Sequence, residues 1–225
     1  MISKYTIMER VWLFSKFYHQ RLCDCENLRK DEKGYASIVL LFNTVENIFK
    51  SILCDYDSSF FNTIKKAKAK AMINDVEYDF LNGDEFSIRK LRNLFAHANL
   101  PAICLMLNKN CSDENNFLYP LSEEDTCMEL YDMFSPIIFN IILKIINTQV
   151  NENFDINIDV EIQKNNPQIK ILNSKELLTY KGFPSDYLDG VEIPEEAKVR
   201  LIDNEPDINS YSNIFKNIAD IENNK

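Results

Sequence analysis

An arginine, an asparagine and a histidine stand close together near the middle of the chain, at Arg92, Asn93 and His97. Histidine is the side chain best suited to transfer protons near neutral pH, because its reference pKa is about 6.5. Arginine grips phosphate oxygens and neutralises the charge that develops on them. Together they suit attack of an RNA 2′-hydroxyl on its own phosphodiester, a step that needs no metal ion.

A helix over residues 84–100 is predicted to carry these three side chains. Asp84 follows an Asn-Gly pair and is the expected N-cap, and Pro101 is the expected stop. The apolar positions recur at helical spacing, at Leu91, Leu94, Phe95 and Ala98. The chemistry therefore sits on one short amphipathic element.

The spacing of the three residues limits how they can meet. Asn93 and His97 are four apart and share a face, so Asn93 can orient the imidazole or a phosphate oxygen. Arg92 and His97 are five apart, which separates them by roughly 140° around an ideal helix. They converge if the arginine side chain curls back, if the helix loosens near Pro101, or if a second subunit completes the site. The third option predicts a homodimer with the two motifs at its interface.

A carboxylate lies within the apolar stripe of the strongest predicted helix, residues 35–54. This residue is Glu46, and a buried carboxylate is costly unless a positive or hydrogen-bonding group meets it. Arg92 and His97 are candidates for that partner. Alternatively, Glu46 lies at the edge of the stripe and pairs only with Lys50 at i+4.

Basic residues cluster on a predicted helix over residues 58–75 and at the start of the motif helix. They are Lys65, Lys66, Lys68 and Lys70, followed by Arg89 and Lys90. Such a run is either a solvated face or a strip that attracts RNA phosphates toward the motif.

The run from Arg92 through Asn93 to His97 resembles the HEPN superfamily motif, in which four to six residues separate an arginine from a histidine. The resemblance covers residues 5–150 and implies an all-α bundle with Glu46 as the acidic residue of an earlier helix. It also implies a metal-independent endoribonuclease that dimerises across two motifs, in toxin–antitoxin or antiviral systems with a regulatory protein or antitoxin. HepT-type members place a tyrosine two residues after the histidine, where this chain has Asn99.

The remaining pattern predicts a mainly α protein with two parts. Residues 1–150 form a helical domain, with a first helix over 5–28 and another that starts at Ser122 and kinks or restarts at Pro136. Residues 151–225 form a small acidic, β-containing extension. Within it we expect a strand over 154–162, a hairpin through residues 169–171, short strands between 177 and 202, and a loosely held end.

The two parts differ in charge, and the acidic extension supports a second functional hypothesis. The net charge is −10, so general attraction to nucleic acid is not expected. Residues 151–225 carry 15 acidic and 8 basic residues, so the helical part keeps only a small excess of acid. The alternative is a catalytically inactive dimerisation or sensing module, or an acidic scaffold whose extension recognises a protein partner.

Neither a cofactor nor a metal is predicted. His19, Cys23 and Cys25 could meet, but no second CxxC or HxxxH pair completes four ligands. The chain start lacks an unbroken apolar stretch, so we expect a cytoplasmic protein with its six cysteines reduced. The apolar run over 136–150 is too short to span a membrane.

Overall fold

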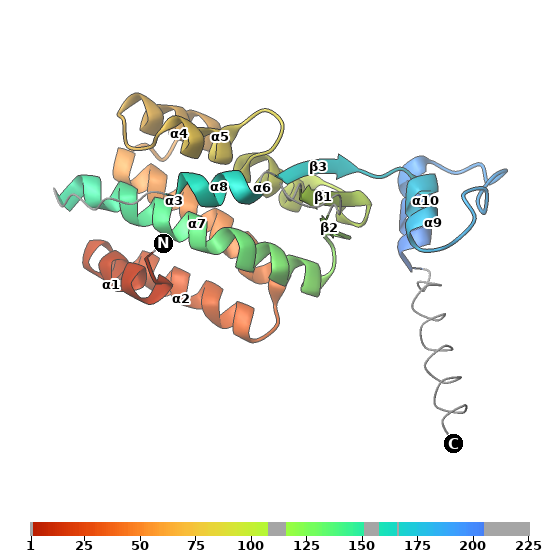
Figure 1. Ribbon diagram of the computed structural model, residues 1–225, viewed down its shortest axis with the longest axis horizontal. Helices are drawn as coiled ribbons and strands as arrows, with labels where there is room; N and C mark the ends of the chain where they lie inside the picture. The colour runs from red at the N-terminus through yellow and green to blue at the C-terminus, as the bar shows by residue number, and fades with distance from the viewer. Residues whose placement is uncertain (1, 108–115, 151–157, 166, 205–225) are drawn as a thin grey trace, which may run out of the picture.

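The computed structural model describes residues 2–107, 116–150, 158–165 and 167–204 (Figure 1). Helices make up 68% of the protein, which confirms the expected mainly α class. The helices are α1 (Lys4–Phe14), α2 (Lys16–Lys30), α3 (Gly34–Leu53), α4 (Phe60–Ala69), α5 (Asp75–Asn82), α6 (Ile88–His97), a 3-10 turn η1 (Leu100–Ala102), α7 (Glu124–Val150), α8 (Asp159–Asn165), α9 (Ser174–Tyr180) and α10 (Glu195–Asn204). The strands are β1 (Ile103–Leu107), β2 (Asn116–Leu118) and β3 (Pro167–Ile171).

The two longest helices, α3 and α7, form the centre of the bundle. Figure 1 shows α1 and α2 along one side of this pair and α4 and α5 along the other. The isoleucine face of α7 is core, because its side chains are almost fully buried at Ile137, Ile138, Ile141, Ile142 and Ile145. α7 continues through Pro136 as one helix, so no restart occurs there.

Helix α3 is long and apolar enough to cross a membrane by length and composition alone. Half of its most apolar 18-residue window is buried inside the protein, and a core helix passes the same test. Its buried side chains contribute to the main hydrophobic core, with Leu41, Phe42 and Ile48 among the most enclosed.

Of the predicted helices, one is divided in two by a capping residue and another ends earlier than expected. The expected helix over 5–28 is interrupted at Ser15, whose backbone is extended and whose hydroxyl accepts a hydrogen bond from the Tyr18 amide. The expected helix over 58–75 ends at Ala69, and Ala71 adopts a positive φ of 56°. Neither change was visible from apolar spacing, because a cap alters the backbone conformation without altering the spacing of apolar residues.

The strand expected over residues 154–162 is wrong where the structure describes it. Residues 159–165 form α8, and residues 151–157 lie outside the described part. Ile158 and Ile162, four apart, are buried in the main core, while Val160 is 57% exposed. Alternating apolar residues suggested a period of two, but burial follows the helical i, i+4 pair.

The strand predicted around residues 169–171 exists, but not as half of a local hairpin. β3 pairs antiparallel with β1, with Leu105 opposite Ile169, and β1 pairs antiparallel with β2 on its other side. Neither β1 nor β2 was predicted from the sequence, and residues 108–115 between them lie outside the described part.

The short strands expected between 177 and 202 are also wrong, because this segment contains α9 and α10. A capping box starts α9, with Asn173 and Glu176 each accepting a hydrogen bond from the other's backbone amide. The two helices share a second, smaller apolar cluster that includes Leu177, Val199 and Ile202. Figure 1 shows this pair beyond the end of β3, away from the main bundle. The division at residue 150 stays a prediction, and residues 205–225 lie outside the described part.

Candidate active site

The N-cap of the helix that carries the motif is Ser87, not Asp84 as predicted. Ser87 is fully buried, and its hydroxyl accepts a hydrogen bond of 3.2 Å from the Lys90 amide. Asp84 is exposed and lies in the bend before the helix. The helix ends at His97, and η1 follows it with Pro101 in its first turn.

Glu46 meets two of the three cations considered for it, Lys50 and Arg92, and not His97. Its side chain is 9% exposed, and Lys50 Nζ lies 2.8 Å from Oε1. Arg92 Nη2 lies 2.8 Å from Oε2. Lys50 is therefore a partner of Glu46 but not its only one, and two cations compensate for burying one carboxylate.

Arg92 is held between a buried acid and an exposed amide. Its Nη1 donates a hydrogen bond of 3.2 Å to Asn93 Oδ1, and its side chain remains 33% exposed. A guanidinium has five N–H donors, so these contacts leave donors that an incoming anion can use. The arrangement can therefore fix Arg92 in place while presenting it to solvent.

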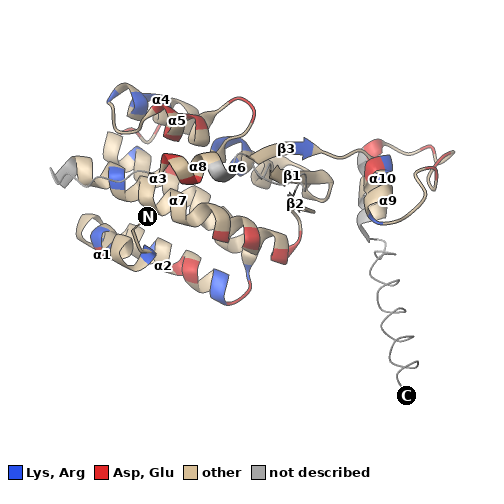
Figure 2. Ribbon diagram, viewed as in Figure 1, with Lys and Arg blue, Asp and Glu red and all other residues tan. Residues whose placement is uncertain are grey.

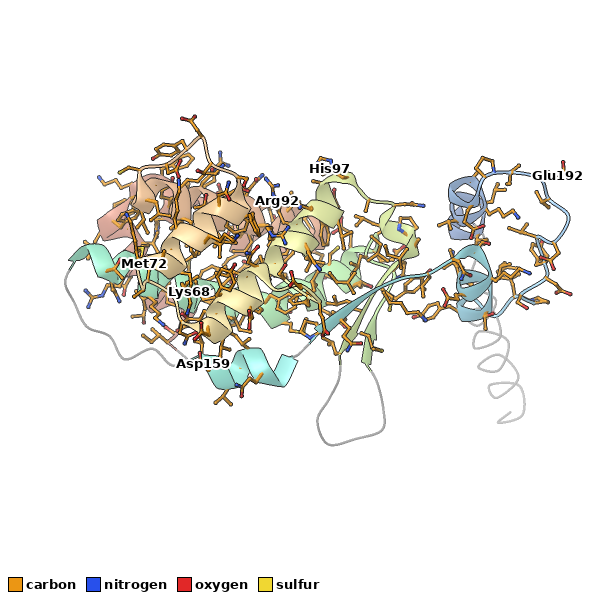
Figure 3. The ribbon with its side chains drawn as sticks, turned by 90° about the horizontal axis from the view of Figure 1, so that it is seen from above. Lys68, Met72, Arg92, His97, Asp159 and Glu192 are labelled. Carbon is orange, nitrogen blue, oxygen red and sulfur yellow. The ribbon has the colours of Figure 1, made fainter. Side chains whose placement is uncertain are left out.

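His97 lies apart from this group. It is exposed in the last turn of α6, and Figure 3 shows it at the end of the helix while Arg92 lies further back. Within the described residues, no hydrogen bond or ion pair joins His97 to Arg92, Asn93 or Glu46. One chain thus brings together three of the four predicted catalytic residues.

Aromatic packing fixes the last turn of the motif helix to α3. Phe95 is buried and contacts the rings of Phe42 and Tyr35. The Tyr35 hydroxyl donates a hydrogen bond of 3.3 Å to the Phe95 carbonyl. Tyr35 is 36% exposed and was not singled out from the sequence. These contacts hold the turn that carries His97.

The predicted basic strip divides into neutralised and available cations. Lys66 forms an ion pair with Asp55, and Lys68 Nζ lies 2.6 Å from Asp75. The hydrogen bonds from Lys66 and Ser58 hold the pKa of the Asp55 carboxyl below its usual value. Acids therefore neutralise part of the strip before any RNA arrives.

The available cations gather on an aromatic ring that the sequence reasoning missed. Lys65 Nζ lies 4.4 Å from the centre of the Phe61 ring, and Arg89 Cζ lies 5.3 Å from it. Arg89 Nε also donates to Asn82 Oδ1 at 2.5 Å. Phe61 is 37% exposed, and its position four residues before Lys65 is a signal visible in the sequence.

The remaining two residues of the predicted strip, Lys70 and Lys90, are described by their positions on the helices. Lys70 is exposed at the C-terminal cap of α4, and Lys90 is half-buried in the first turn of α6. Figure 2 shows lysine and arginine colour on α4 and α6, while the start of α7 is acidic. The basic character is therefore local to these two helices.

An acidic pocket lies on the side of α5 that faces α8. It has a volume of about 730 Å³, and its lining includes Asp79, Asp84 and Glu85 together with Phe80 and Phe86. None of the motif residues lines it. Three carboxylates repel phosphate, so this pocket is not suited to hold RNA.

Comparison with family models, with curated protein sequences and with solved structures finds no match to this chain. Any functional assignment therefore depends on the residues and contacts described above.

Proposed function

We propose that the chain is a metal-independent endoribonuclease of HEPN type, working as a homodimer in a toxin–antitoxin or phage-defence setting. The observation that carries this proposal is the ion pair of Arg92 with the buried Glu46, which fixes a partly exposed guanidinium beside Asn93. A preorganised cation aimed at solvent is what a developing phosphorane charge requires.

His97 is assigned the proton transfer. The 2′-oxygen of RNA gives its proton up and attacks the adjacent phosphorus, the bond to the 5′-oxygen breaks, and the leaving oxygen takes a proton. His97 moves the proton at the 2′-oxygen or at the 5′-oxygen, and Arg92 stabilises the charged phosphorane between these events. Asn93 positions a phosphate oxygen, and Glu46 positions Arg92. The products carry a 2′,3′-cyclic phosphate and a free 5′-hydroxyl.

A second subunit is needed because His97 and Arg92 lie apart on one chain. In the dimer, Arg92 of one subunit and His97 of the other act on the same phosphodiester. This arrangement is supported by the exposure of both side chains on α6 and by the angle between them.

The RNA backbone is proposed to follow the cations from α4 to α6. Arg89 lies three positions before Arg92 on the same helix, so both project near one face. Phe61, held between Lys65 and Arg89, offers an exposed edge for contact with a base. The local strip thereby overcomes the repulsion expected from an overall charge of −10.

Mixed dimers test the proposal most sharply. Arg92→Gln and His97→Ala chains are each expected to be inactive, and mixing them should restore cleavage. One of the two sites in a mixed dimer then contains both an intact arginine and an intact histidine. The assay uses labelled RNA in EDTA and detects the cyclic phosphate, with Arg21→Gln on the exposed face of α2 as control. Cleavage by either single variant at the parental rate would overturn the assignment.

The second candidate is an inactive HEPN-like dimerisation or sensing module, or an acidic protein-binding scaffold. It is favoured by the position of His97 in the last turn of α6, where a basic side chain is stabilising in any protein. In that case Arg92 serves only to neutralise Glu46. Folded dimers that bind a protein partner and cut no RNA would select this candidate.

A further inference from the structure

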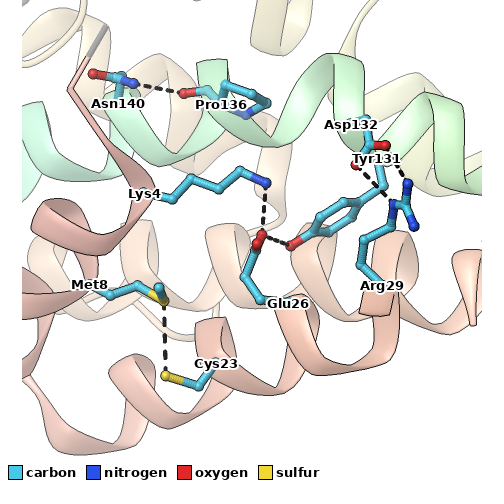
Figure 4. A network of polar contacts seen from close by, with 9 residues as sticks. All are labelled: Lys4, Met8, Cys23, Glu26, Arg29, Tyr131, Asp132, Pro136 and Asn140. Carbon is cyan, nitrogen blue, oxygen red and sulfur yellow. Dashed lines mark hydrogen bonds and ion pairs between the residues drawn. The ribbon is translucent and has the colours of Figure 1, made fainter. Parts of the chain in front are cut away.

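Three soft or borderline ligand atoms converge between the first two helices, far along the sequence from the motif. Met8 on α1 lies beside His19 and Cys23 on α2, and all three side chains are half-buried. Cys23 Sγ lies 3.4 Å from His19 Nε2 and 3.9 Å from Met8 Sδ. Figure 4 shows the sulfur–sulfur contact. We refer to this group as the Met8–His19–Cys23 cluster.

The imidazole of His19 is already oriented for ligation. Its Nδ1 lies 2.9 Å from the Met8 carbonyl oxygen, which can only accept a hydrogen bond. Nδ1 therefore carries the proton, and in the neutral ring Nε2 presents its lone pair toward Cys23. A backbone carbonyl that fixes the tautomer in this way is typical of histidines that bind metals.

The thiol alone cannot satisfy its two neighbours. Cys23 has one S–H proton, whereas both His19 Nε2 and Met8 Sδ present acceptor lone pairs to it. A cation placed among the three atoms would accept all three lone pairs. The cluster therefore presents more lone pairs than its single S–H proton can satisfy by hydrogen bonding.

The separations fit three-coordinate metal geometry. With metal–sulfur and metal–nitrogen bonds of about 2.3 and 2.0 Å, trigonal angles separate two sulfurs by about 4.0 Å and sulfur from nitrogen by about 3.7 Å. The observed separations are 3.9 and 3.4 Å. Both separations from Cys23 therefore lie within about 0.3 Å of these values.

We propose that the Met8–His19–Cys23 cluster binds one Cu(I) ion. A thiolate, a thioether and an imidazole are the ligands that Cu(I) prefers, and the thioether argues against zinc. Zinc would also need a fourth ligand, and the described residues contain no group of three His, Cys, Asp or Glu side chains suited to a metal. Sequence reasoning missed the cluster because it considered Cys25, which is buried in the core, and not Met8.

Binding leaves the site electrically neutral. The Cys23 proton passes to water as the Cu–S bond forms, so one thiolate balances one monovalent cation. A neutral complex is compatible with three half-buried ligands. No electron is transferred, provided that copper is supplied in the reduced state.

An entry path reaches the histidine from solvent. A pocket of about 420 Å³ is lined by Glu9, Trp12, Leu13 and His19. The Trp12 ring stands edge-on to the imidazole, with ring centres 5.0 Å apart and planes at 85°. Trp12 can therefore report copper binding through its fluorescence, and it is the only tryptophan in the chain.

The test is anaerobic titration of the full chain with Cu(I) against a chromophoric Cu(I) chelator. We expect one ion per chain, quenching of Trp12 fluorescence, and X-ray absorption from two sulfurs and one nitrogen. Cys23→Ser and Met8→Leu should each weaken binding by at least the 10–100-fold that outer-shell changes cost. The matched control is Cys54→Ser, which removes an exposed free cysteine elsewhere.

Three results would overturn the proposal. The first is Cu(I) affinity unchanged in folded Cys23→Ser and Met8→Leu proteins, with circular dichroism as the check on folding. The second is loss of binding in Cys54→Ser, which would place the ion at that thiol. The third is a parental chain that fails to compete with the chelator.

Discussion

The buried carboxylate of Glu46 lies 2.8 Å from the guanidinium of Arg92, and this ion pair joins the central helix of the bundle to the motif helix. The ion pair can contribute to stability, to catalysis or to both. Replacing Arg92 with lysine distinguishes these contributions. Lysine keeps the charge that Glu46 needs but lacks the planar, two-point grip on phosphate.

Arg92→Lys is therefore expected to retain most of the stability and lose most of the cleavage. Arg92→Ala, in contrast, leaves Lys50 as the remaining cation on Glu46 and should lower the free energy of unfolding by about 1–3 kcal/mol. Urea unfolding and RNA cleavage on the same samples measure both effects. Parental cleavage by Arg92→Lys would show that only the charge matters.

The N-cap of the motif helix gives a second prediction. Ser87→Ala removes the hydroxyl that accepts the Lys90 amide and should cost about 1 kcal/mol of stability. Asp84→Ala, at the exposed position that the sequence suggested, should change stability by less than about 0.5 kcal/mol. Chemical denaturation of the two variants compares them directly, and the reverse order of effects would contradict the capping assignment.

RNA affinity should depend on the Phe61 group and not on every lysine of the strip. Lys65→Ala and Phe61→Ala are each expected to weaken RNA binding, because the first removes a cation and the second removes the ring that holds Lys65 and Arg89. Lys68→Ala should have a smaller effect, since Asp75 already neutralises Lys68. Fluorescence anisotropy at several salt concentrations tests this, and equal losses for Lys65 and Lys68 would argue against a defined path.

A buried ion pair away from the motif should be sensitive to the loss of one partner. Glu77 is fully buried, and Lys144 Nζ lies 2.8 Å from both of its carboxylate oxygens. Lys144→Met leaves this charge without its cation and should destabilise the protein by about 3 kcal/mol. Adding Glu77→Gln should recover part of the loss, and Lys170→Met at an exposed pair should cost little.

The buried thiol of Cys25 predicts loss of stability at alkaline pH. Burial raises its pKa from 9.0 to about 12, with Glu26 and Asp24 acting in the same direction. Because the unfolded thiol loses its proton first, this contribution to stability is complete below pH 9 and declines as the pH rises toward 12. The slope is up to about 1.4 kcal/mol per pH unit. Cys25→Ala should flatten this decline between pH 9 and 11, whereas Cys54→Ala should not.

Local signals in the sequence were enough for the main helices and for the Glu46 contact. Apolar spacing located α3, α6 and α7, and the cost of burying a carboxylate predicted that Glu46 needs a cation. The misses came from interactions that a short window cannot contain. α8 is helical because Ile158 and Ile162 pack on a core built by distant residues.

The site shows the same limit. Arg92 and Asn93 contact each other because they are neighbours on one helix, which spacing alone suggests. Met8 reaches Cys23 only because α1 packs against α2 across the break at Ser15, and that break was not predicted. The contact between Met8 and Cys23 depends on the geometry of that break, so it could not be predicted from the residue types alone.

The pairing of β1 with β3 sets an order on how the nascent chain can fold. Sixty to sixty-eight residues separate the paired positions, and all of α7 lies between them. β1 begins six residues after His97, so the sheet next to the end of the motif helix cannot be completed until residue 171 has left the ribosome. Synthesis adds about 5–20 residues per second. Several seconds therefore pass between the synthesis of β1 and the synthesis of β3, with which it pairs. During this interval, a protein that binds the nascent chain can reach the motif helix before the sheet beside it is complete.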